Sequence, residues 1–312
     1  MFWSKCSKIL LIFSLILALI GLLTYNVVDY TQYLQGVARA ANHPKGRDDN
    51  STIANGIPLR IMFIGASITR GEASTGDRGY RKHIRDTIMS YGNAVNAVGF
   101  NRLGDWDDND VEGWGAFRIR TITKHANQSV PAVQPNLILV QVGTSDCFQD
   151  DDIENIGARM RTFVNLMLEA EPRATIIMST LTTTPRPERE PCILSANVQI
   201  RQVAEDLKNE KKPVTLAEMH FDQGLPDRPT LDDIGPDGIH PTDEGYIMMG
   251  NIFLESIREV EWRGFLQAPA NNGIPDNGDD GREVEDEIKE KAEKEHPIEP
   301  KLRRGADVEH MI

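Results

Sequence analysis

Short apolar segments alternate with segments of helical periodicity between residues 57 and 266. The apolar runs lie at residues 58–65, 93–100, 135–143, 174–180 and 213–219. The intervening and following segments predict helices over 79–91, 153–170, 195–209 and 242–260, the last with Thr242 as its N-cap. Apolar strands that alternate with helices form parallel sheets covered on both faces. The pattern therefore predicts an α/β domain with a three-layer, doubly wound, flavodoxin-like fold around a five-stranded parallel sheet.

The N-terminus has the pattern of a secretory targeting segment. Lys5 and Lys8 precede an apolar run that extends from Ile9 to about Val28. This run is longer than the usual ~7–15 apolar residues of a signal peptide and approaches the ~20 of a membrane span. We interpret residues 1–29 as a signal peptide or a signal-anchor helix. The length favours an uncleaved transmembrane anchor, with the remainder lumenal or extracellular, but cleavage and secretion stay open.

Two other features suit the secretory pathway. The triplets Asn50-Ser51-Thr52 and Asn127-Gln128-Ser129 are acceptor motifs for N-glycosylation, although such triplets also arise by chance. Cys147 and Cys192 could form a disulfide in an oxidising compartment. The alternative is two unrelated buried thiols, and the sequence alone does not decide between them.

The flanking segments differ from the central domain in composition. Residues 30–56 are polar and are interpreted as a linker, and residues 57–266 as the folded domain. Residues 267–312 hold 13 acidic and 7 basic residues. Residues 282–295 could form a solvated charged helix, but they have too few apolar side chains to bury a face, so we expect residues 267–312 to be an acidic, disordered tail. The net charge of −13 argues against a nucleic-acid partner. Much of it comes from the tail, so it says little about the substrate.

A candidate nucleophile follows the first predicted strand. In the segment Gly65–Gly71, Ser67 occupies the strand-to-helix turn, where a hydroxyl can stand above the sheet and the backbone N–H can bind an anion. The alternative is an ordinary helix N-cap serine. A phosphate-binding loop is disfavoured because no Gly-Lys-Ser/Thr sequence follows.

A candidate acid–base pair lies between the last strand and the closing helix, in Asp237-Gly238-Ile239-His240-Pro241. A carboxylate three residues before a histidine can turn back onto the imidazole and leave the second ring nitrogen to accept a serine proton. The alternative is a polar loop in which Asp237 caps a turn. A metal site is disfavoured because no second histidine or carboxylate cluster has ligand spacing.

Two further loops belong to the same edge of the predicted sheet. Residues 143–147 follow the central strand with Thr144 and Ser145, and residues 112–119 contain two glycines that permit close backbone approach to a ligand. Each motif alone is weak. We expect Trp114 and Phe117 to serve packing, and Arg70 and Arg118 to be solvated or paired.

Taken together and in this chain order, the four loops resemble the SGNH (GDSL-type) hydrolase superfamily. The likeness extends over about residues 58–260 and is greatest to the branch related to carbohydrate esterase family three, which includes acetyl xylan esterases. The resemblance implies that Ser67 is the nucleophile, His240 the general base and Asp237 its orienting partner. It also implies an oxyanion hole formed by the nucleophile's N–H, a glycine N–H of the second loop and an asparagine of the third. The superfamily uses no metal or other cofactor.

The sequence departs from the family pattern at three positions. Ala66 replaces the aspartate of Gly-Asp-Ser, and Ser145 replaces the asparagine of Gly-Thr-Asn-Asp. Ala116, preceded by Gly115, stands where the oxyanion glycine is expected. The expected oxyanion hole therefore consists of Ser67, Gly115, Ala116 and Ser145. Since loss of one oxyanion donor typically slows catalysis ~10²–10³-fold, these changes predict a slow enzyme.

These observations predict a serine ester hydrolase that acts through an acyl-enzyme on acylated carbohydrate. The alternative is a catalytically weakened or inactive protein of the same fold that binds glycan or cell-wall polymer. A nucleotide-binding module is disfavoured because the chain lacks a glycine-rich phosphate fingerprint with a downstream ribose carboxylate. The sequence leaves the acyl group, the alcohol and the oligomeric state open.

Overall fold

The computed structural model describes residues 51–298. Residues 51–221 and 227–298 belong to one compact unit, and residues 222–226 fall outside this unit. Its centre is a sheet of five parallel strands in the order β2-β1-β5-β6-β7. These strands are β1 (Leu59–Gly65), β2 (Val95–Val98), β5 (Leu137–Gln141), β6 (Thr175–Ser179) and β7 (Val214–Ala217). The predicted doubly wound α/β fold is confirmed.

Two short strands that the sequence did not predict extend the sheet. Strands β3 (Asn101–Arg102) and β4 (Asp110–Gly113) pair antiparallel, and β4 also pairs in parallel with the end of β1, through Ile64↔Glu112 and Gly65↔Gly113. Neither strand has an apolar pattern, because β3 has two polar residues and the side chains of Asp110 and Glu112 are polar although buried. This pairing brings the second predicted loop beside the candidate nucleophile.

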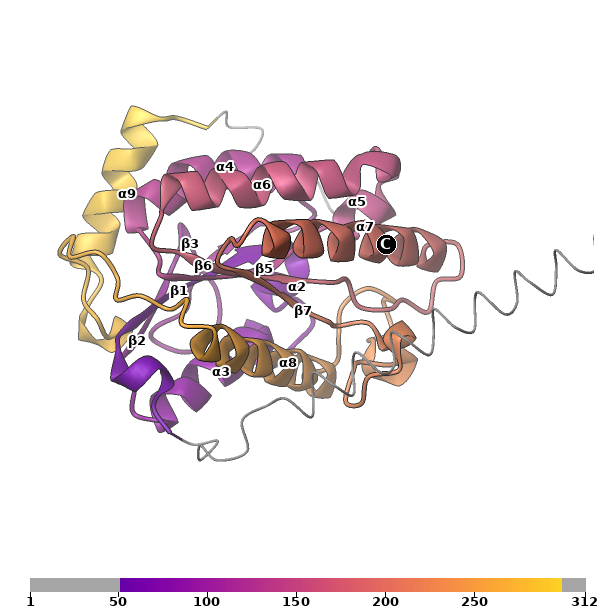
Figure 1. Ribbon diagram of the computed structural model, residues 1–312, viewed down its shortest axis with the longest axis horizontal. Coiled ribbons are helices and arrows are strands. Elements are labelled where there is room, and N and C mark those ends of the chain that lie inside the picture. The colour runs from indigo at the N-terminus through magenta and orange to yellow at the C-terminus, as the bar shows by residue number, and fades with distance from the viewer. Residues whose placement is uncertain (1–50, 299–312) are drawn as a thin grey trace, which may run out of the picture. The chain divides into compact units, whose positions relative to one another are not determined.

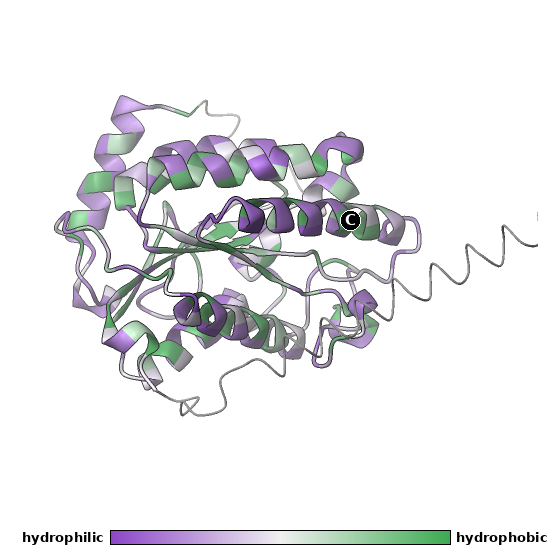
Figure 2. Ribbon diagram, in the orientation of Figure 1, coloured by the Kyte–Doolittle hydropathy of each residue, from purple (hydrophilic) through white to green (hydrophobic). Residues whose placement is uncertain are grey.

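Helices cover the two faces of the sheet (Figure 1). One face carries α4 (Ile119–Val133), α6 (Ile156–Ala170) and α7 (Glu190–Asn209), and the other carries α3 (Gly79–Ser90) and α8 (Asp243–Trp262). Colouring by hydropathy shows green strands between helices with one green and one purple side (Figure 2). This is the expected result of burying one apolar stripe per helix. Thr242 is the N-cap of α8, as predicted, and its side chain accepts a hydrogen bond of 3.1 Å from Gly245 N.

Helix α4 was not among the predicted elements. It contains the polar triplet Asn127-Gln128-Ser129 and, in its last turn, Pro131, all of which weaken the helical pattern in the sequence. Its buried apolar residues nevertheless recur at helical spacing, at Ile119, Ile122, Ala126, Val130 and Val133. Tertiary packing of this stripe therefore outweighs the poor local propensity.

The domain begins before residue 57, so part of the expected linker belongs to it. Ile53 is fully buried in the core beneath α3 and α8. The Asn93 side chain accepts a hydrogen bond from Ile53 N and donates to the carbonyl oxygens of Ile53 and Ile57. These bonds fasten residues 53–57 to the turn before β2.

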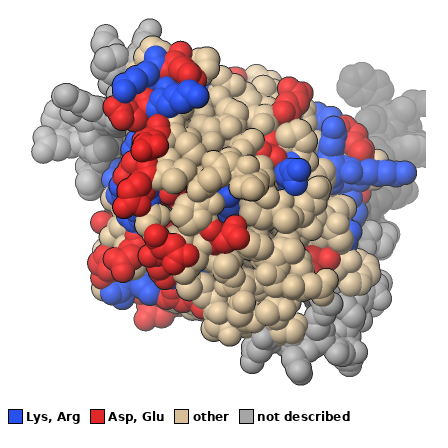
Figure 3. Space-filling model, turned by 90° about the vertical axis from the view of Figure 1, so that its left-hand side faces the viewer, with Lys and Arg blue, Asp and Glu red and all other residues tan. Residues whose placement is uncertain are grey.

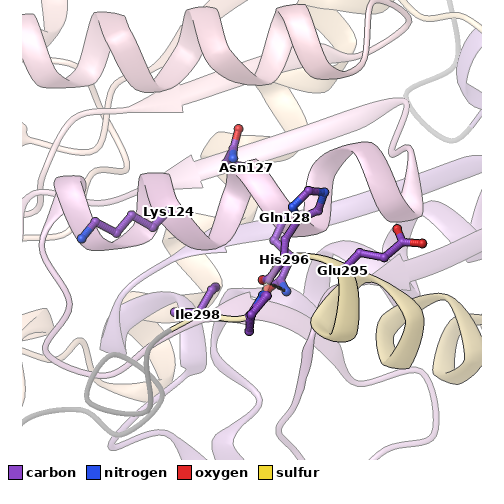
Figure 4. Close-up of a pocket in the computed structure, with 7 residues that line it drawn as sticks. Lys124, Asn127, Gln128, Glu295, His296 and Ile298 are labelled. Carbon is purple, nitrogen blue, oxygen red and sulfur yellow. Dashed lines mark hydrogen bonds between the residues drawn. The ribbon is translucent and has the colours of Figure 1, made fainter.

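The expectation of disorder is wrong for residues 283–295, which form helix α9 against α4. The Gln128 side chain donates hydrogen bonds to the carbonyl oxygens of Ala292 (3.1 Å) and His296 (2.7 Å) at the end of α9. Gln128 and His296 lie together in Figure 4, beside a hollow of about 470 Å³ that Asn127 and Ile298 also line. The low apolar content was misleading because a narrow apolar stripe of Val284, Ile288 and Ala292 suffices to pack this helix on the core, and the Gln128 hydrogen bonds add to the attachment.

Charged side chains on α9 are largely paired. Asp286 accepts from Arg102 at 2.5 Å, and Lys294 and Glu290 pair at 2.7 Å on the helix surface. Seen from the side of α9, acidic and basic side chains lie intermingled along one margin, while much of the face is uncharged (Figure 3). The acidity of this segment is thus partly neutralised within the fold.

Cys147 and Cys192 form a disulfide, which decides between the two alternatives left open by the sequence. It joins the short helix α5 (Thr144–Phe148) to the first turn of α7.

The predicted N-terminal anchor and Asn50 lie outside the described residues. None of the helices within residues 51–298 combines the length and the hydropathy that a bilayer crossing requires. Asn127 is exposed on α4, and its glycosylation stays a prediction.

Replacing both cysteines, as Cys147→Ser with Cys192→Ser, should lower the free energy of unfolding by about 2–4 kcal/mol, because a 45-residue loop is no longer closed in the unfolded chain. Urea unfolding of the wild type with and without a thiol reductant measures the same difference. The double variant should not respond to the reductant. Equal stability of variant and oxidised wild type would contradict the prediction.

Candidate active site

The turn after β1 presents Ser67 at the carboxyl edge of the sheet. A Cβ atom on Gly65 would lie 1.9 Å from the carbonyl oxygen of Gln141 and 2.2 Å from the Thr69 hydroxyl, so this close approach of β1 to β5 requires glycine. Ala66 is the N-cap of helix α2 (Ser67–Arg70), and Ser67 is its first residue. The N-cap interpretation of Ser67 is therefore wrong, and its hydroxyl is engaged elsewhere.

The structure brings Ser67, His240 and Asp237 together although 173 residues separate Ser67 from His240. His240 Nε2 lies 2.8 Å from Ser67 Oγ, and His240 Nδ1 lies 2.7 Å from Asp237 Oδ2. The second carboxylate oxygen of Asp237 accepts hydrogen bonds from the backbone N–H groups of Ile239 and His240. A carboxylate thus orients an imidazole whose other nitrogen faces a hydroxyl.

Asp237 is held in its ionised form. Burial alone would raise the pKa of its carboxyl group, but the hydrogen bonds from the His240 imidazole and from two backbone N–H groups outweigh this effect and lower the pKa below its ordinary value. A carboxylate that stays ionised keeps Nδ1 of His240 protonated. Nε2 is then free to accept the proton of the Ser67 hydroxyl.

Backbone contacts close the loop that carries Asp237 and His240. Ile234 and Pro241 form an antiparallel bridge, and Gly235 N donates to His240 O at 2.7 Å. Gly238 has a φ of +70°, a conformation that a side chain would strain, and donates to Gly235 O. The tight turn leaves both functional side chains on the same side of the loop.

A second loop, between β6 and α7, holds this turn in place through hydrogen bonds from Thr184 and Arg186, which together we call the clamp. Arg186 donates from Nη2 to Asp237 O at 2.5 Å, and Thr184 donates from its hydroxyl to Gly238 O at 2.6 Å. Glu190 holds the clamping loop in turn, because its carboxylate accepts from Thr184 N and from Thr183 and lies 3.0 Å from His220 Nε2. These residues could not be identified from the sequence, since their proximity exists only in the folded chain.

Glu190 is partly buried, which alone would raise its pKa. The bond with His220 and those with Thr183 and Thr184 instead lower the pKa of its carboxyl group below the ordinary value. An ionised Glu190 is the better acceptor for these three donors. The clamp is therefore built on a charged group at the start of α7.

The loop after β4 lies against the nucleophile turn. Trp114 N donates to Gly65 O at 3.0 Å, and the Trp114 indole donates to buried Glu112 at 2.7 Å. Trp114 also stacks on Phe117 with a ring distance of 5.8 Å, so both aromatic residues pack as predicted. Ala116 has a φ of +58°, a backbone conformation in which glycine is usual, at the position where the family pattern has glycine. Its carbonyl oxygen accepts from Gln149 at 2.7 Å.

The loop after β5 carries Ser145 in helix α5, with 9% of its surface exposed. Asp146 beside it is fully buried and has a structural role, since it accepts from Ile119 N and from Arg159 at 3.0 Å each. Burial raises the pKa of Asp146 despite these bonds.

Gly65 and Gln141 are in register, so the loops that follow β1 and β5 leave the sheet at the same edge.

One further charged residue lies at the site and was not predicted. Glu72 Oε2 is 3.7 Å from His240 Nε2, and Glu72 Oε1 pairs with Arg70 Nη1 at 3.1 Å. The prediction that Arg70 and Arg118 are solvated or paired is confirmed, since Arg118 pairs with Asp151. Glu72 follows the Gly65–Gly71 motif directly, but its sequence position alone does not reveal that the side chain faces His240.

Within residues 51–298, no three metal-ligating side chains cluster.

The model of the GDSL-like Lipase/Acylhydrolase family matches residues 63–247, which is more than half of the chain. The chain belongs to this family. The matched segment contains Ser67, Asp237 and His240, and the GDSL resemblance predicted from the four loops is confirmed. Membership in a lipase and acylhydrolase family supports the expected carboxylic ester hydrolase.

Solved structures similar to this GDSL-family chain include two carbohydrate esterases of family 3. That from Talaromyces cellulolyticus is 21% identical with a TM-score of 0.56, over 66% of this chain and 99% of the other. That from Clostridium thermocellum is 21% identical with a TM-score of 0.57, over 67% and 99%. At this identity both likenesses concern the fold.

A multidomain esterase from Ruminococcus flavefaciens is 27% identical over 266 residues, which is 72% of this chain and 32% of that protein. The chain therefore spans about a third of the length of this relative.

Replacing Thr184 by Val should lower kcat for 4-nitrophenyl acetate roughly 5–30-fold and leave KM unchanged. The variant loses the bond to Gly238 O and the bond accepted from Arg186 N, and a loss of about 1–2 kcal/mol loosens the Asp237 turn. Thr184→Ser should restore most of the rate. Thr162→Val, the same change at an exposed helical position, serves as the matched control. A kcat in Thr184→Val equal to that of the control would contradict the prediction.

Proposed function

We propose that this GDSL-family protein is a serine ester hydrolase that acts through an acyl-enzyme. The observation that carries the proposal is the hydrogen-bonded series of Asp237, His240 and Ser67, with contacts of 2.7 and 2.8 Å. A hydroxyl, an imidazole and a carboxylate in this order form the constellation that activates serine for attack on a carbonyl carbon.

In the first step, Ser67 Oγ attacks the ester carbonyl while His240 Nε2 takes the hydroxyl proton. The resulting imidazolium is stabilised by ionised Asp237 on Nδ1. When the tetrahedral intermediate collapses, the carbon–oxygen bond to the alcohol breaks and His240 returns the proton to the departing alcohol oxygen. The acyl group remains as an ester on Ser67.

In the second step, His240 takes a proton from a water molecule, which attacks the acyl-enzyme. Collapse of the second tetrahedral intermediate returns the proton to Ser67 Oγ and releases the carboxylic acid.

We propose that the backbone N–H groups of Ser67 and Ala116, with the Ser145 hydroxyl, stabilise the oxyanion. Gly115 permits the loop to pack closely, as argued below. Ser145 reaches less far than the asparagine of the family pattern, so we expect slow turnover. The left-handed backbone of Ala116 supports a role that the family gives to glycine.

For the substrate we propose an acylated carbohydrate. The support is the similarity of the four loops to the branch related to carbohydrate esterase family three. Carbohydrate esterases of family 3 are also among the structures with a similar fold. We also propose that the protein acts in the secretory pathway or outside the cell. The Cys147–Cys192 disulfide supports this location, because disulfides persist in oxidising compartments.

Ser67→Ala should abolish hydrolysis of 4-nitrophenyl acetate and labelling by a fluorophosphonate probe, with unfolding by urea unchanged. His240→Gln should give the same two losses. Activity in Ser67→Ala equal to that of the wild type would refute the serine mechanism. A wild type that neither turns over the ester nor takes the label, yet retains glycan, would favour the alternative of a catalytically inactive glycan-binding protein.

Ser145→Asn should raise kcat at least about tenfold, because the longer amide restores an oxyanion donor worth roughly 2.7–4 kcal/mol in related chemistry. Ser145→Ala should lower kcat, since it removes the remaining hydroxyl. Stopped-flow or steady-state assays of both variants with one ester measure the expected increase and the expected decrease in kcat. Identical kcat values in all three proteins would mean that residue 145 does not contact the oxyanion.

A further inference from the structure

Glu72 is rigidly attached at the active site through its backbone. Its N–H donates to Ser67 O at 3.1 Å, and its carbonyl oxygen accepts from the buried Tyr246 hydroxyl at 2.8 Å. Both neighbours belong to the turn and helix that carry the site. The Glu72 side chain therefore starts from a fixed point beside Ser67.

The two carboxylate oxygens of Glu72 have different neighbours. Oε2 lies 3.7 Å from His240 Nε2, whereas Oε1 pairs with Arg70 at 3.1 Å. Both side chains are about one-third exposed, at 33% each. The negative charge thus lies beside the imidazole. Arg70, which pairs with the other carboxylate oxygen, also lines a hollow of about 240 Å³ with Asn101, Arg102 and Trp114.

The backbone of the β4 loop is shaped around this ion pair. A Cβ atom on Gly115 would lie 2.7 Å from Arg70 Nη1 and 2.8 Å from Glu72 Oε1. Any side chain at position 115 would displace the pair. The Glu72 carboxylate therefore has the imidazole of His240 as one neighbour and the backbone of Gly115 as another.

The chemistry of ester cleavage determines which part of the substrate meets Glu72. His240 Nε2 must deliver a proton to the departing alcohol, so the alcohol oxygen must come within hydrogen-bond reach of that nitrogen. Glu72 Oε2 is a neighbour of the same atom. The alcohol portion is then adjacent to a fixed carboxylate, which attracts hydroxyl donors and cations and repels anions.

We propose that Glu72 is a specificity-determining residue that selects esters of neutral or cationic alcohols, such as neutral or amino sugars, over esters of anionic alcohols such as uronic acids. Arg70 partly offsets the selection, because it pairs with the other carboxylate oxygen of Glu72. This inference rests on the proposed serine mechanism and specifies the alcohol that the mechanism would release.

The test compares two aryl acetates that differ in leaving-group charge. The anionic substrate is 4-acetoxybenzoate and its neutral counterpart is methyl 4-acetoxybenzoate. The measured quantity is the ratio of kcat/KM for the neutral ester to that for the anionic ester. Comparing this ratio between protein variants cancels the intrinsic reactivities of the two esters.

Glu72→Gln should lower the ratio about tenfold, which corresponds to ~1.4 kcal/mol of removed repulsion. Arg70→Gln should raise it, because Glu72 is then unpaired. Opposite shifts cannot arise from general damage to the site, which would change both substrates alike. Glu290→Gln removes the same charge from α9 and should leave the ratio unchanged. The cationic ester 3-(trimethylammonio)phenyl acetate should lose rate in Glu72→Gln relative to the neutral ester.

A wild-type activity that depends on Ser67, combined with the same ratio in Glu72→Gln and wild type, would overturn this inference and leave the serine mechanism standing. Equal shifts in Glu72→Gln and Glu290→Gln would overturn it as well, since the effect would then be one of net charge. An activity that does not depend on Ser67 would overturn both proposals together.

Discussion

The pairing of β1 with its neighbours is the constraint on which the candidate site depends. At its carboxyl end β1 runs so close to β5 that Gly65 has no space for a side chain, and on the other side it accepts the backbone of Trp114. Ser67, Ala116 and Ser145 each follow within a few residues of these contacts. A shift of one residue in the strand register would exchange the faces of β1 and separate all three loops.

The acid–base loop is positioned differently, because no strand ends directly before it. It is fixed by its own bridge between Ile234 and Pro241 and by the clamp from Thr184 and Arg186. The first turn of α7 anchors this clamp through Glu190 and is linked by Cys192 to the helix that carries Ser145. One helix end thus connects the base to the third loop of the site.

The sequence was sufficient for the layers of the fold, because strand patterns are local features. It also pointed to Ser67, Asp237 and His240, which the structure brings within hydrogen-bond distance of one another. It was insufficient where a polar side chain is useful only after folding. Strands β3 and β4 have no apolar pattern, α4 is interrupted by polar residues, and α9 packs only a narrow apolar stripe on the core and is also attached through Gln128. Glu72 and Thr184 were missed for the same reason, since their partners are 168 and 54 residues away along the chain.

The attachment of residues 267–298 has a consequence for how such a domain can be exchanged between proteins. Composition changes near residue 266, yet the guanidinium of buried Arg60 donates to the carbonyl oxygens of Ala270 and Ile274, and Asn96 donates to Glu285. Recombination at the compositional boundary would transfer a domain in which buried Arg60 and Asn96 had lost the acceptors that residues 267–298 supply. A viable evolutionary module therefore has to extend to the end of α9.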